Sequence, residues 1–197
     1  MGKGRLFVVS GPSGVGKGTV ISALLSKYPK AWLSISATTR KPRPGERHGV
    51  DYFFIEEDDF LDKARKGDFL EWAEVHGNLY GTPVGEVERK LAEGRDVFLE
   101  IDVKGALQVM KKVPDAITIF LAPPSMEELE KRLLKRGTES EEEIDIRLRN
   151  AEKEARFAQS FRYLIINDDL ERAVEELCAI YEKERGGNNG QDKDVGG

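Results

Sequence analysis

GPSGVGKGTV, at Gly11–Val20, is the segment that most strongly indicates the fold of this chain. It contains the spacing GxxxxGK, which Gly16 and Lys17 close, and the apolar run RLFVVS (Arg5–Ser10) comes directly before it. From Lys17 to about Tyr28, apolar residues recur at helical spacing. A buried strand, a glycine-rich turn and a helix form a phosphate-binding loop, because the N–H groups of the turn and helix N-terminus point at an anion. We therefore predict that this loop binds nucleotide phosphates and that Lys17 adds a mobile positive charge.

Gly18 differs from the usual form of this motif, in which a Ser or Thr hydroxyl after the lysine binds Mg²⁺. Mg²⁺ readily keeps several water ligands, so nucleotide phosphates and water can hold the ion without a direct protein ligand. Thr19 is a second candidate donor beside this position. We expect Gly18 to change how Mg²⁺ is held without removing phosphoryl-transfer activity.

Three later apolar runs have the length and composition of buried parallel strands. They are VFLEI at Val97–Ile101, AITIFL at Ala116–Leu121 and YLII at Tyr163–Ile166. Segments of helical character separate or follow them, at residues 103–112, 125–136 and 170–184. This alternation predicts an α/β fold in which a parallel sheet is flanked by helices on both faces.

Two regions interrupt the alternation. Residues 36–90 are rich in Arg, Gly, Pro and aromatic side chains, and short runs such as YFFI predict a small mixed insertion. Residues 130–158 are almost entirely charged and helical, so we expect them to lie outside the core. A Gly-Thr pair separates two helices there, and Ser140 and Glu143 have the spacing of a capping box. The polar end of the chain, residues 185–197, is expected to be a disordered tail.

The composition limits the partners of the chain. Its 197 residues carry a net charge of −5, so it lacks the basic excess of a nucleic-acid-binding protein. The single cysteine, Cys178, excludes an internal disulfide and is expected on a buried helix face. No apolar run approaches the length of about 18 residues that a membrane-spanning helix needs, so we expect a cytoplasmic chain with no membrane partner. The two histidines have no third ligand nearby, which predicts no metal site built from protein side chains alone.

Arg40 and Arg43 flank a Lys-Pro pair within SISATTRKPRPGERHGVDYFF, residues 34–54. Pro42 and Pro44 keep the backbone extended, and guanidinium groups bind phosphate through paired hydrogen bonds. The arginines either bind a phosphate or belong to an exposed basic loop. The stretch alone favours the exposed loop and leaves phosphate binding open.

Glu71 lies in the apolar run FLEWAEVHGNLYGTP, residues 69–83. A carboxylate in such a strand must face solvent by strand alternation or accept hydrogen bonds from a specific donor. Alternation places Leu70 and Trp72 on one face and Glu71 on the other. From these residues alone we prefer the solvent-facing interpretation.

Taken together, these stretches resemble the guanylate kinase family over nearly the whole chain, from about Gly4 to Glu182. The similar motifs are GPSGVGKGT, SISATTRKPRPGE, DYFF, FLEWAEVHGNLYGT, EIDVKGA, FLAPPS, KRGTESEEEIDIRL and IIND. The resemblance implies transfer of the γ-phosphoryl group of ATP to GMP, giving ADP and GDP. It also implies a P-loop NTPase fold with a core, a GMP-binding insertion and a helical lid. These would comprise residues 4–35, 91–129 and 159–184 for the core, 36–90 for the insertion and 130–158 for the lid.

By motif position, the resemblance implies a GMP site made of Ser36, Arg40, Arg43, Tyr52, Glu71, Tyr80, Gly81, Thr82 and Asp102. The two arginines and two tyrosines would hold the phosphate of GMP, or of dGMP. Glu71 would bind guanine with Ser36, Thr82 and Asp102, because the N1–H and 2-amino group of guanine are adjacent donors for one carboxylate. Adenine lacks this pair, so a buried carboxylate disfavours it.

The ATP site that the resemblance implies comprises Gly11, Pro12, Ser13, Gly14, Val15, Gly16, Lys17, Gly18, Thr19, Arg132, Arg136 and Asn167. Asn167 would lie near the adenine. The lid arginines Arg132, Arg136 and Arg147 would meet the phosphates when the lid closes.

The catalytic set would be Lys17, Arg40, Arg136 and Arg147, which neutralise charge during transfer. Asp102 would also orient water bound to Mg²⁺, the cofactor that accompanies ATP. Arg132 has an equal alternative, an ion pair with Glu128 on a solvated helix. The family often has Gln where Lys104 stands, so no role is assigned to that lysine.

Two other functions stay open at this point. The chain could be a binding module of this fold without catalysis, but Lys17 and an arginine-bearing lid favour an enzyme. It could be a kinase of the same fold that acts on AMP or a ribose bisphosphate, but Glu71 with Tyr80 and Thr82 favours guanine. The sequence does not decide between a monomer and a homo-oligomer.

Overall fold

The computed structural model describes residues 3–75, 77–136 and 140–186. Its centre is a five-stranded sheet of order β2-β7-β1-β8-β9, in which all neighbouring strands are parallel. The strands are β1 (Leu6–Ser10), β2 (Ala31–Leu33), β7 (Asp96–Glu100), β8 (Ile117–Ala122) and β9 (Tyr163–Ile166). The predicted α/β fold with a parallel sheet is confirmed, and the four apolar runs form four of these strands. Strand β2 is not predictable from the sequence, because three residues are too few to show a period.

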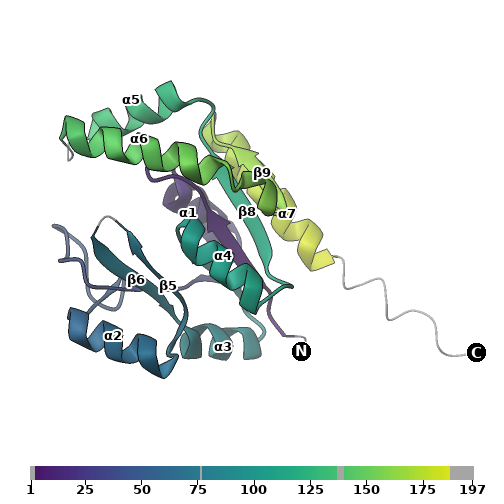
Figure 1. The fold of residues 1–197 in the computed structure, drawn as a ribbon. Coiled ribbons are helices and arrows are strands. Elements are labelled where there is room, and N and C mark those ends of the chain that lie inside the picture. Colours follow the sequence, from purple (N-terminus) through teal and green to yellow (C-terminus); the bar gives the residue numbers. More distant parts are fainter. Residues whose placement is uncertain (1–2, 76, 137–139, 187–197) are drawn as a thin grey trace, which may run out of the picture.

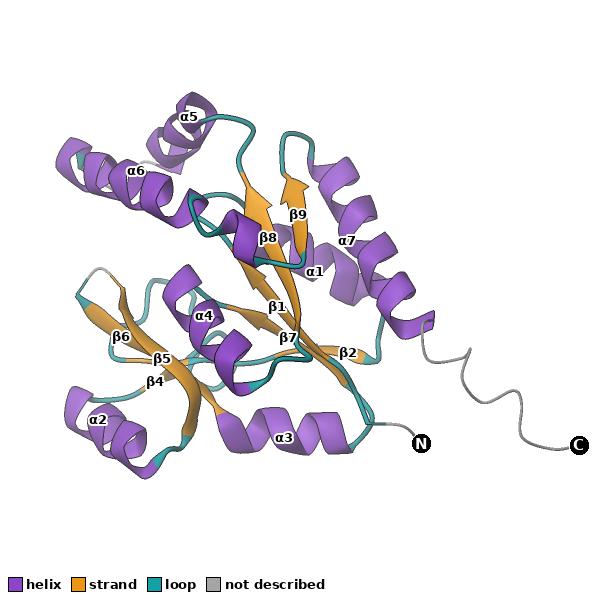
Figure 2. Cartoon of the chain, turned by 45° about the vertical axis from the view of Figure 1, so that its right-hand side comes forward, coloured by secondary structure: helices purple, strands orange, loops and turns teal. Residues whose placement is uncertain are grey.

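Helices cover both faces of this sheet (Figures 1 and 2). One face carries α1 (Lys17–Lys27) and α7 (Leu170–Gly186), and the other carries α3 (Val84–Ala92) and α4 (Val103–Lys112). Along β1, Phe7 and Val9 pack with the first pair of helices, whereas Leu6 and Val8 pack with the second. Because both faces are buried, β1 is apolar from Leu6 to Val9.

A second, smaller sheet of order β4-β3-β6-β5 forms the insertion. Its elements are β3 (Ala37–Thr38), β4 (Phe53–Phe54), α2 (Glu57–Lys66), β5 (Phe69–Val75) and β6 (Asn78–Pro83). Ala37, Phe60 and Phe69 form a small apolar cluster of its own. Helix α3 crosses residue 90, where the expected insertion ends, and its Val87 and Leu91 pack on the core sheet.

Two charged helices, α5 (Met126–Arg136) and α6 (Glu141–Ala155), lie beyond the end of β8 (Figure 1). Leu129, Leu133 and Ile144 join them in a cluster separate from the main core, as expected. The predicted capping box is confirmed, since Ser140 Oγ accepts from the Glu143 N–H and Glu143 Oε2 accepts from the Ser140 N–H. The Gly-Thr pair before it lies outside the described residues. The short 3-10 helix η1 (Ala158–Ser160) joins α6 to β9.

Helix α7 runs to Gly186, two residues into the expected tail, and residues 187–197 lie outside the described part of the chain. Cys178 is buried on this helix, as predicted. Among the described helices, none combines the length and apolar character needed to cross a membrane.

Candidate nucleotide-binding site

The phosphate loop follows the carboxyl end of β1, the edge at which open α/β sheets bind ligands. At Gly11 (φ +145°), an added Cβ would lie 2.1 Å from the carbonyl oxygen of Leu121. At Gly16 (φ +99°), it would lie 2.7 Å from Asn167 Nδ2. Only glycine fits either position without strain, so the loop depends on both residues.

Lys17 and Asn167 fix the loop from two sides. Lys17 Nζ donates to the carbonyl oxygens of Gly11 at 2.7 Å and Pro12 at 3.1 Å. Buried Asn167 donates from Nδ2 to the carbonyl of Val15 at 2.7 Å. The structure therefore places Asn167 against the loop, and its expected contact with adenine stays a prediction.

A cleft of about 230 Å³, here called the central cleft, lies between the core, the insertion and the lid helices. Ten of the predicted site residues line it, namely Gly11, Ser13, Lys17, Ser36, Arg43, Tyr52, Glu71, Tyr80, Asp102 and Arg147. They come from the loop, the small sheet, the end of β7 and α6. The fold thus brings together residues that lie up to 136 positions apart, from Gly11 to Arg147.

Two predicted arginines are not among the residues that line the central cleft. Arg40 Nη2 donates to both carboxylate oxygens of Glu46, at 2.9 and 3.0 Å. Arg132 Nε donates to Glu128 Oε1 at 3.3 Å, which is the i,i+4 pair considered as its alternative. The side chain of Arg136 lies outside the described residues.

Glu46 organises the expected phosphate end of the GMP site. Besides pairing with Arg40, its Oε2 accepts from the backbone N–H of Arg43 at 2.7 Å. The Arg40 guanidinium lies 5.4 Å from the ring centroid of Tyr52, and Tyr52 meets Tyr80 edge-on at 6.0 Å. The two arginines and two tyrosines therefore gather at one place. The sequence carries no signal for this role of Glu46, which is one of many surface-type acidic residues.

Glu71 is 3% exposed, so the solvent-facing interpretation is wrong. Alternation did separate Glu71 from Trp72, but Trp72 is the exposed residue of the two. The reason is helix α4, which covers the Glu71 face of β5. Its Gly105 leaves the room that the carboxylate needs, because a Cβ there would lie 2.2 Å from Glu71 Oε2.

The Glu71 carboxyl titrates near neutral pH. Burial raises its pKa to about 7, and the negative Asp102 adds to the rise. Hydrogen bonds from Thr82 oppose it, and Thr82 Oγ1 donates to Glu71 Oε1 at 2.6 Å. Asp102 itself caps α4 by accepting from the Gly105 N–H at 2.8 Å.

Arg147 brings a charged group of the lid to the phosphate loop. Arg147, on α6, donates from Nη1 to Ser13 Oγ at 2.8 Å. Arg147 and Lys17 thus line the same cleft, and the expected contact of Arg147 with the phosphates stays a prediction.

Comparison with known proteins decides the family. The model of the guanylate kinase family matches residues 3–184. The chain belongs to the guanylate kinase family. It is 52% identical over 190 residues to the guanylate kinase of Symbiobacterium thermophilum, covering 95% of this chain and 90% of the relative. The guanylate kinase of Synechococcus sp. is 51% identical over 90% of this chain and 82% of its own length.

A solved structure of a guanylate kinase has the same fold. The crystal structure of the Anaplasma phagocytophilum guanylate kinase superposes with a TM-score of 0.78 at 34% identity. The match covers 93% of this chain and 87% of that one. Fold and family membership therefore agree with the motifs of the sequence.

Two carboxylates of the central cleft were missed in the sequence. Glu100 ends β7, and a Cβ added at Gly18 would lie 3.2 Å from its Oε2. The Glu100 carboxylate thus occupies space beside the position where this motif usually carries a hydroxyl. The run VFLEID contained a signal, because Glu100 is the polar end of an otherwise apolar strand.

Glu154 on α6 is the second carboxylate of the central cleft that was not predicted from the sequence. It lines the central cleft, and burial raises its pKa to about 7, although the nearby Lys17 lowers it. The charged pattern of the lid gave no signal for it, since Glu154 is one of many acidic residues on that helix.

Proposed function

We propose that this member of the guanylate kinase family transfers the γ-phosphoryl group of ATP to GMP in the central cleft. The observation that carries the proposal is the joint presence of Lys17, Arg147 and buried Glu71 in one cleft. The two cations suit phosphates, and a buried carboxylate suits a base with adjacent N–H donors.

Glu71 would select guanine. Its carboxylate accepts from N1–H and the 2-amino group, and such a pair of hydrogen bonds is worth roughly 1–3 kcal/mol of discrimination. Thr82 already orients one carboxylate oxygen, while Ser36 and Asp102 line the same cleft. Adenine would leave the buried carboxylate without these donors.

The phosphate of GMP would lie between Arg43, Tyr52 and Tyr80. Arg40 would join them by leaving Glu46, so GMP competes with this carboxylate for the guanidinium. The exchange keeps the charge of Arg40 compensated both with and without GMP.

The phosphate loop, Lys17 and Arg147 would bind and align the phosphates of ATP, and Arg136 would join them from the lid. Transfer depends on alignment and charge neutralisation, because the attacking phosphate oxygen of GMP is already ionised and needs no general base. The lid helices would exclude water, which otherwise accepts the phosphoryl group.

The donor set beside the loop fits Mg²⁺, which prefers oxygen ligands and retains water. Thr19, Glu100 and Asp102 would hold the ion, directly or through its water. When bound with ATP, Mg²⁺ neutralises phosphate charge.

An assay of ADP release with MgATP tests the proposed function directly. We expect turnover with GMP and little turnover with AMP or without an acceptor. Turnover with AMP in place of GMP would contradict the role of Glu71. ATP binding without turnover on any acceptor would indicate a binding module.

Replacing Glu71 with glutamine is expected to raise the KM for GMP about tenfold, because the amide cannot accept from both donors. In the unaltered protein, GMP affinity should fall as the pH drops below about 7, since the protonated carboxyl no longer accepts both hydrogen bonds. The measurement is the KM for GMP between pH 6 and 8, in steps across the value of about 7. The phosphate of GMP also titrates near pH 6, so the glutamine variant supplies the reference curve.

The same substitution should not destabilise the ligand-free fold. A carboxyl whose pKa is about 7 when folded and 4.5 otherwise disfavours the folded state progressively as the pH rises through this window. We therefore expect Glu71→Gln to melt at or above the temperature of the parent at pH 8. A lower melting temperature together with lost GMP binding would indicate a structural role for Glu71 instead.

Replacing Glu100 with glutamine is expected to raise the Mg²⁺ concentration for half-maximal turnover about tenfold, as for residues that orient metal-bound water. Glu88→Gln on α3 is the matched control, since that glutamate is exposed and does not line the central cleft. An unchanged Mg²⁺ requirement would remove Glu100 from the metal site.

A further inference from the structure

A second hollow, here called the basal hollow, lies at the opposite end of the central sheet from the phosphate loop. It has a volume of about 820 Å³, and Leu6 and Ile117, which begin β1 and β8, line it. The phosphate loop follows the other end of β1, about 15 Å away for a strand of this length. A nucleotide in the central cleft would therefore leave the basal hollow accessible.

Four cations line the basal hollow, Lys3, Arg5, Arg162 and Lys183, against the two carboxylates Asp115 and Glu184. The chain as a whole carries a net charge of −5, so this positive excess reverses the overall sign. Clustered cations in a concave surface attract anions more strongly than scattered ones, because the low-dielectric walls focus the field.

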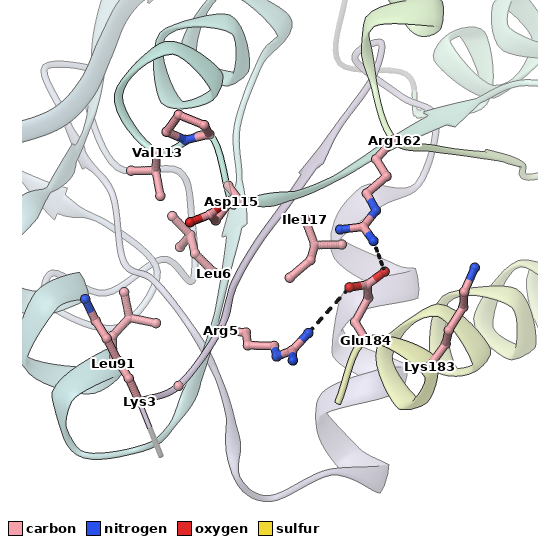
Figure 3. A pocket seen from close by; sticks show the side chains of 13 residues that line it. Lys3, Arg5, Leu6, Leu91, Val113, Asp115, Ile117, Arg162, Lys183 and Glu184 are labelled. Carbon is pink, nitrogen blue, oxygen red and sulfur yellow. Dashed lines mark hydrogen bonds and ion pairs between the residues drawn. The ribbon is translucent and has the colours of Figure 1, made fainter. Parts of the chain in front are cut away.

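Glu184 neutralises only part of this positive charge. It is 6% exposed and lies between Arg5 and Arg162, at 3.5 and 3.0 Å (Figure 3). The Tyr163 hydroxyl also donates to it, at 2.5 Å. The Glu184 carboxylate thus holds both guanidinium groups in place. Its single negative charge neutralises only one of their two positive charges.

The two lysines add positive charge that no carboxylate of the described residues neutralises through an ion pair. Within the described parts of the chain, neither Lys3 nor Lys183 forms an ion pair with a carboxylate. Lys183 Nζ lies 5.3 Å from the ring centroid of Tyr163. Figure 3 shows Lys183 across Glu184 from Arg5. Two exposed ammonium groups at the margin and a fixed guanidinium pair inside form a site with several donors for phosphate oxygens.

The remaining wall of the basal hollow is apolar. Val113 and Pro114 expose apolar surface to it, and the buried Leu6, Leu91 and Ile117 line it as well. Pockets that take small molecules combine such walls with a few charged groups, in volumes of about 300–1,000 Å³. The lining therefore suits a ligand with an apolar body and a strongly anionic end, rather than an inorganic ion alone.

We propose that the basal hollow binds an organic phosphate. This ligand is a small molecule with an apolar or aromatic part and with phosphate groups that carry at least two negative charges. The guanidinium pair and the two lysines bind the phosphates, and the apolar surface of Val113 and Pro114 packs against the body. This site does not depend on the proposed function of the central cleft, because it shares no lining residue with that cleft.

The test is a titration of the full chain with ADP, inorganic tripolyphosphate and sulfate in the absence of Mg²⁺, followed by backbone amide NMR signals. The amides of Gly4 and Ala116 report on the basal hollow, and those of Gly14 and Gly16 report on the phosphate loop. We expect ADP to shift the Gly4 and Ala116 signals with a dissociation constant below about 1 mM. Tripolyphosphate should bind there at least about threefold more weakly, because it has no apolar body, and sulfate more weakly still.

The double variant Lys3→Gln, Lys183→Gln should weaken ADP binding at Gly4 and Ala116 about tenfold while the phosphate-loop signals respond as before. Lys63→Gln, a lysine of α2 in the insertion, is the control for loss of charge and should change neither set. The proposal is overturned if the Gly4 and Ala116 signals do not saturate, if the double variant binds as the parent does, or if tripolyphosphate matches ADP.

Discussion

Lys17→Ala is expected to lower turnover with GMP by about a hundredfold or more, a barrier increase of at least about 2.7 kcal/mol. The ammonium group is held over the phosphate loop by the carbonyls of Gly11 and Pro12, so it is positioned before phosphates arrive. Its loss removes positive charge where the transferred group becomes most anionic. The measurement is kcat at saturating MgATP and GMP.

Lys27→Ala, in the last turn of the same helix, is the matched control for this prediction. Both variants should melt close to the parent, because the hydrogen bonds from Lys17 Nζ to the carbonyls of Gly11 and Pro12 are only partly buried. Near-normal kcat in Lys17→Ala, with intact folding, would refute a role for this lysine in transfer.

Arg147→Ala is expected to lower kcat by about tenfold to a thousandfold with a smaller change in the KM for ATP. Lid arginines that neutralise charge in the transition state can contribute several orders of magnitude to phosphoryl transfer. The hydrogen bond from Arg147 to Ser13 shows that the guanidinium reaches the loop from α6. A residue that acts mainly in the transition state should affect kcat more than substrate binding.

The control is Arg149→Ala on the same helix, since Arg149 is exposed and its Nε donates to the backbone carbonyl of Asp145. That variant should keep near-normal kcat. If Arg147→Ala raised only the KM for ATP, the arginine would bind ATP without acting in the transition state. Ser13→Ala separates the two effects further, because it removes the partner of Arg147 and keeps the charge.

The phosphate loop and the parallel sheet were predictable from the amino-acid sequence alone. Their signals are local, because Gly11, Gly16 and Lys17 act through backbone conformation and a single helix start, and each buried strand is one apolar run. The capping box at Ser140 and Glu143 was predictable for the same reason, since its two hydrogen bonds join residues three positions apart. The order of the motifs along the chain also indicated the guanylate kinase family.

The burial and pairing of the polar side chains depend on contacts between elements that are distant in the sequence. Glu71 is buried because α4, which begins more than thirty residues later, covers its face and has Gly105 at the contact. The Glu100 carboxylate lies against Gly18 because β7 pairs with β1 in the sheet. Glu184 forms ion pairs with both Arg5 and Arg162, which come from opposite ends of the chain. Burial and charge pairing are set by elements distant in the sequence. A local pattern can therefore name the face on which a residue lies, but it cannot say what covers that face.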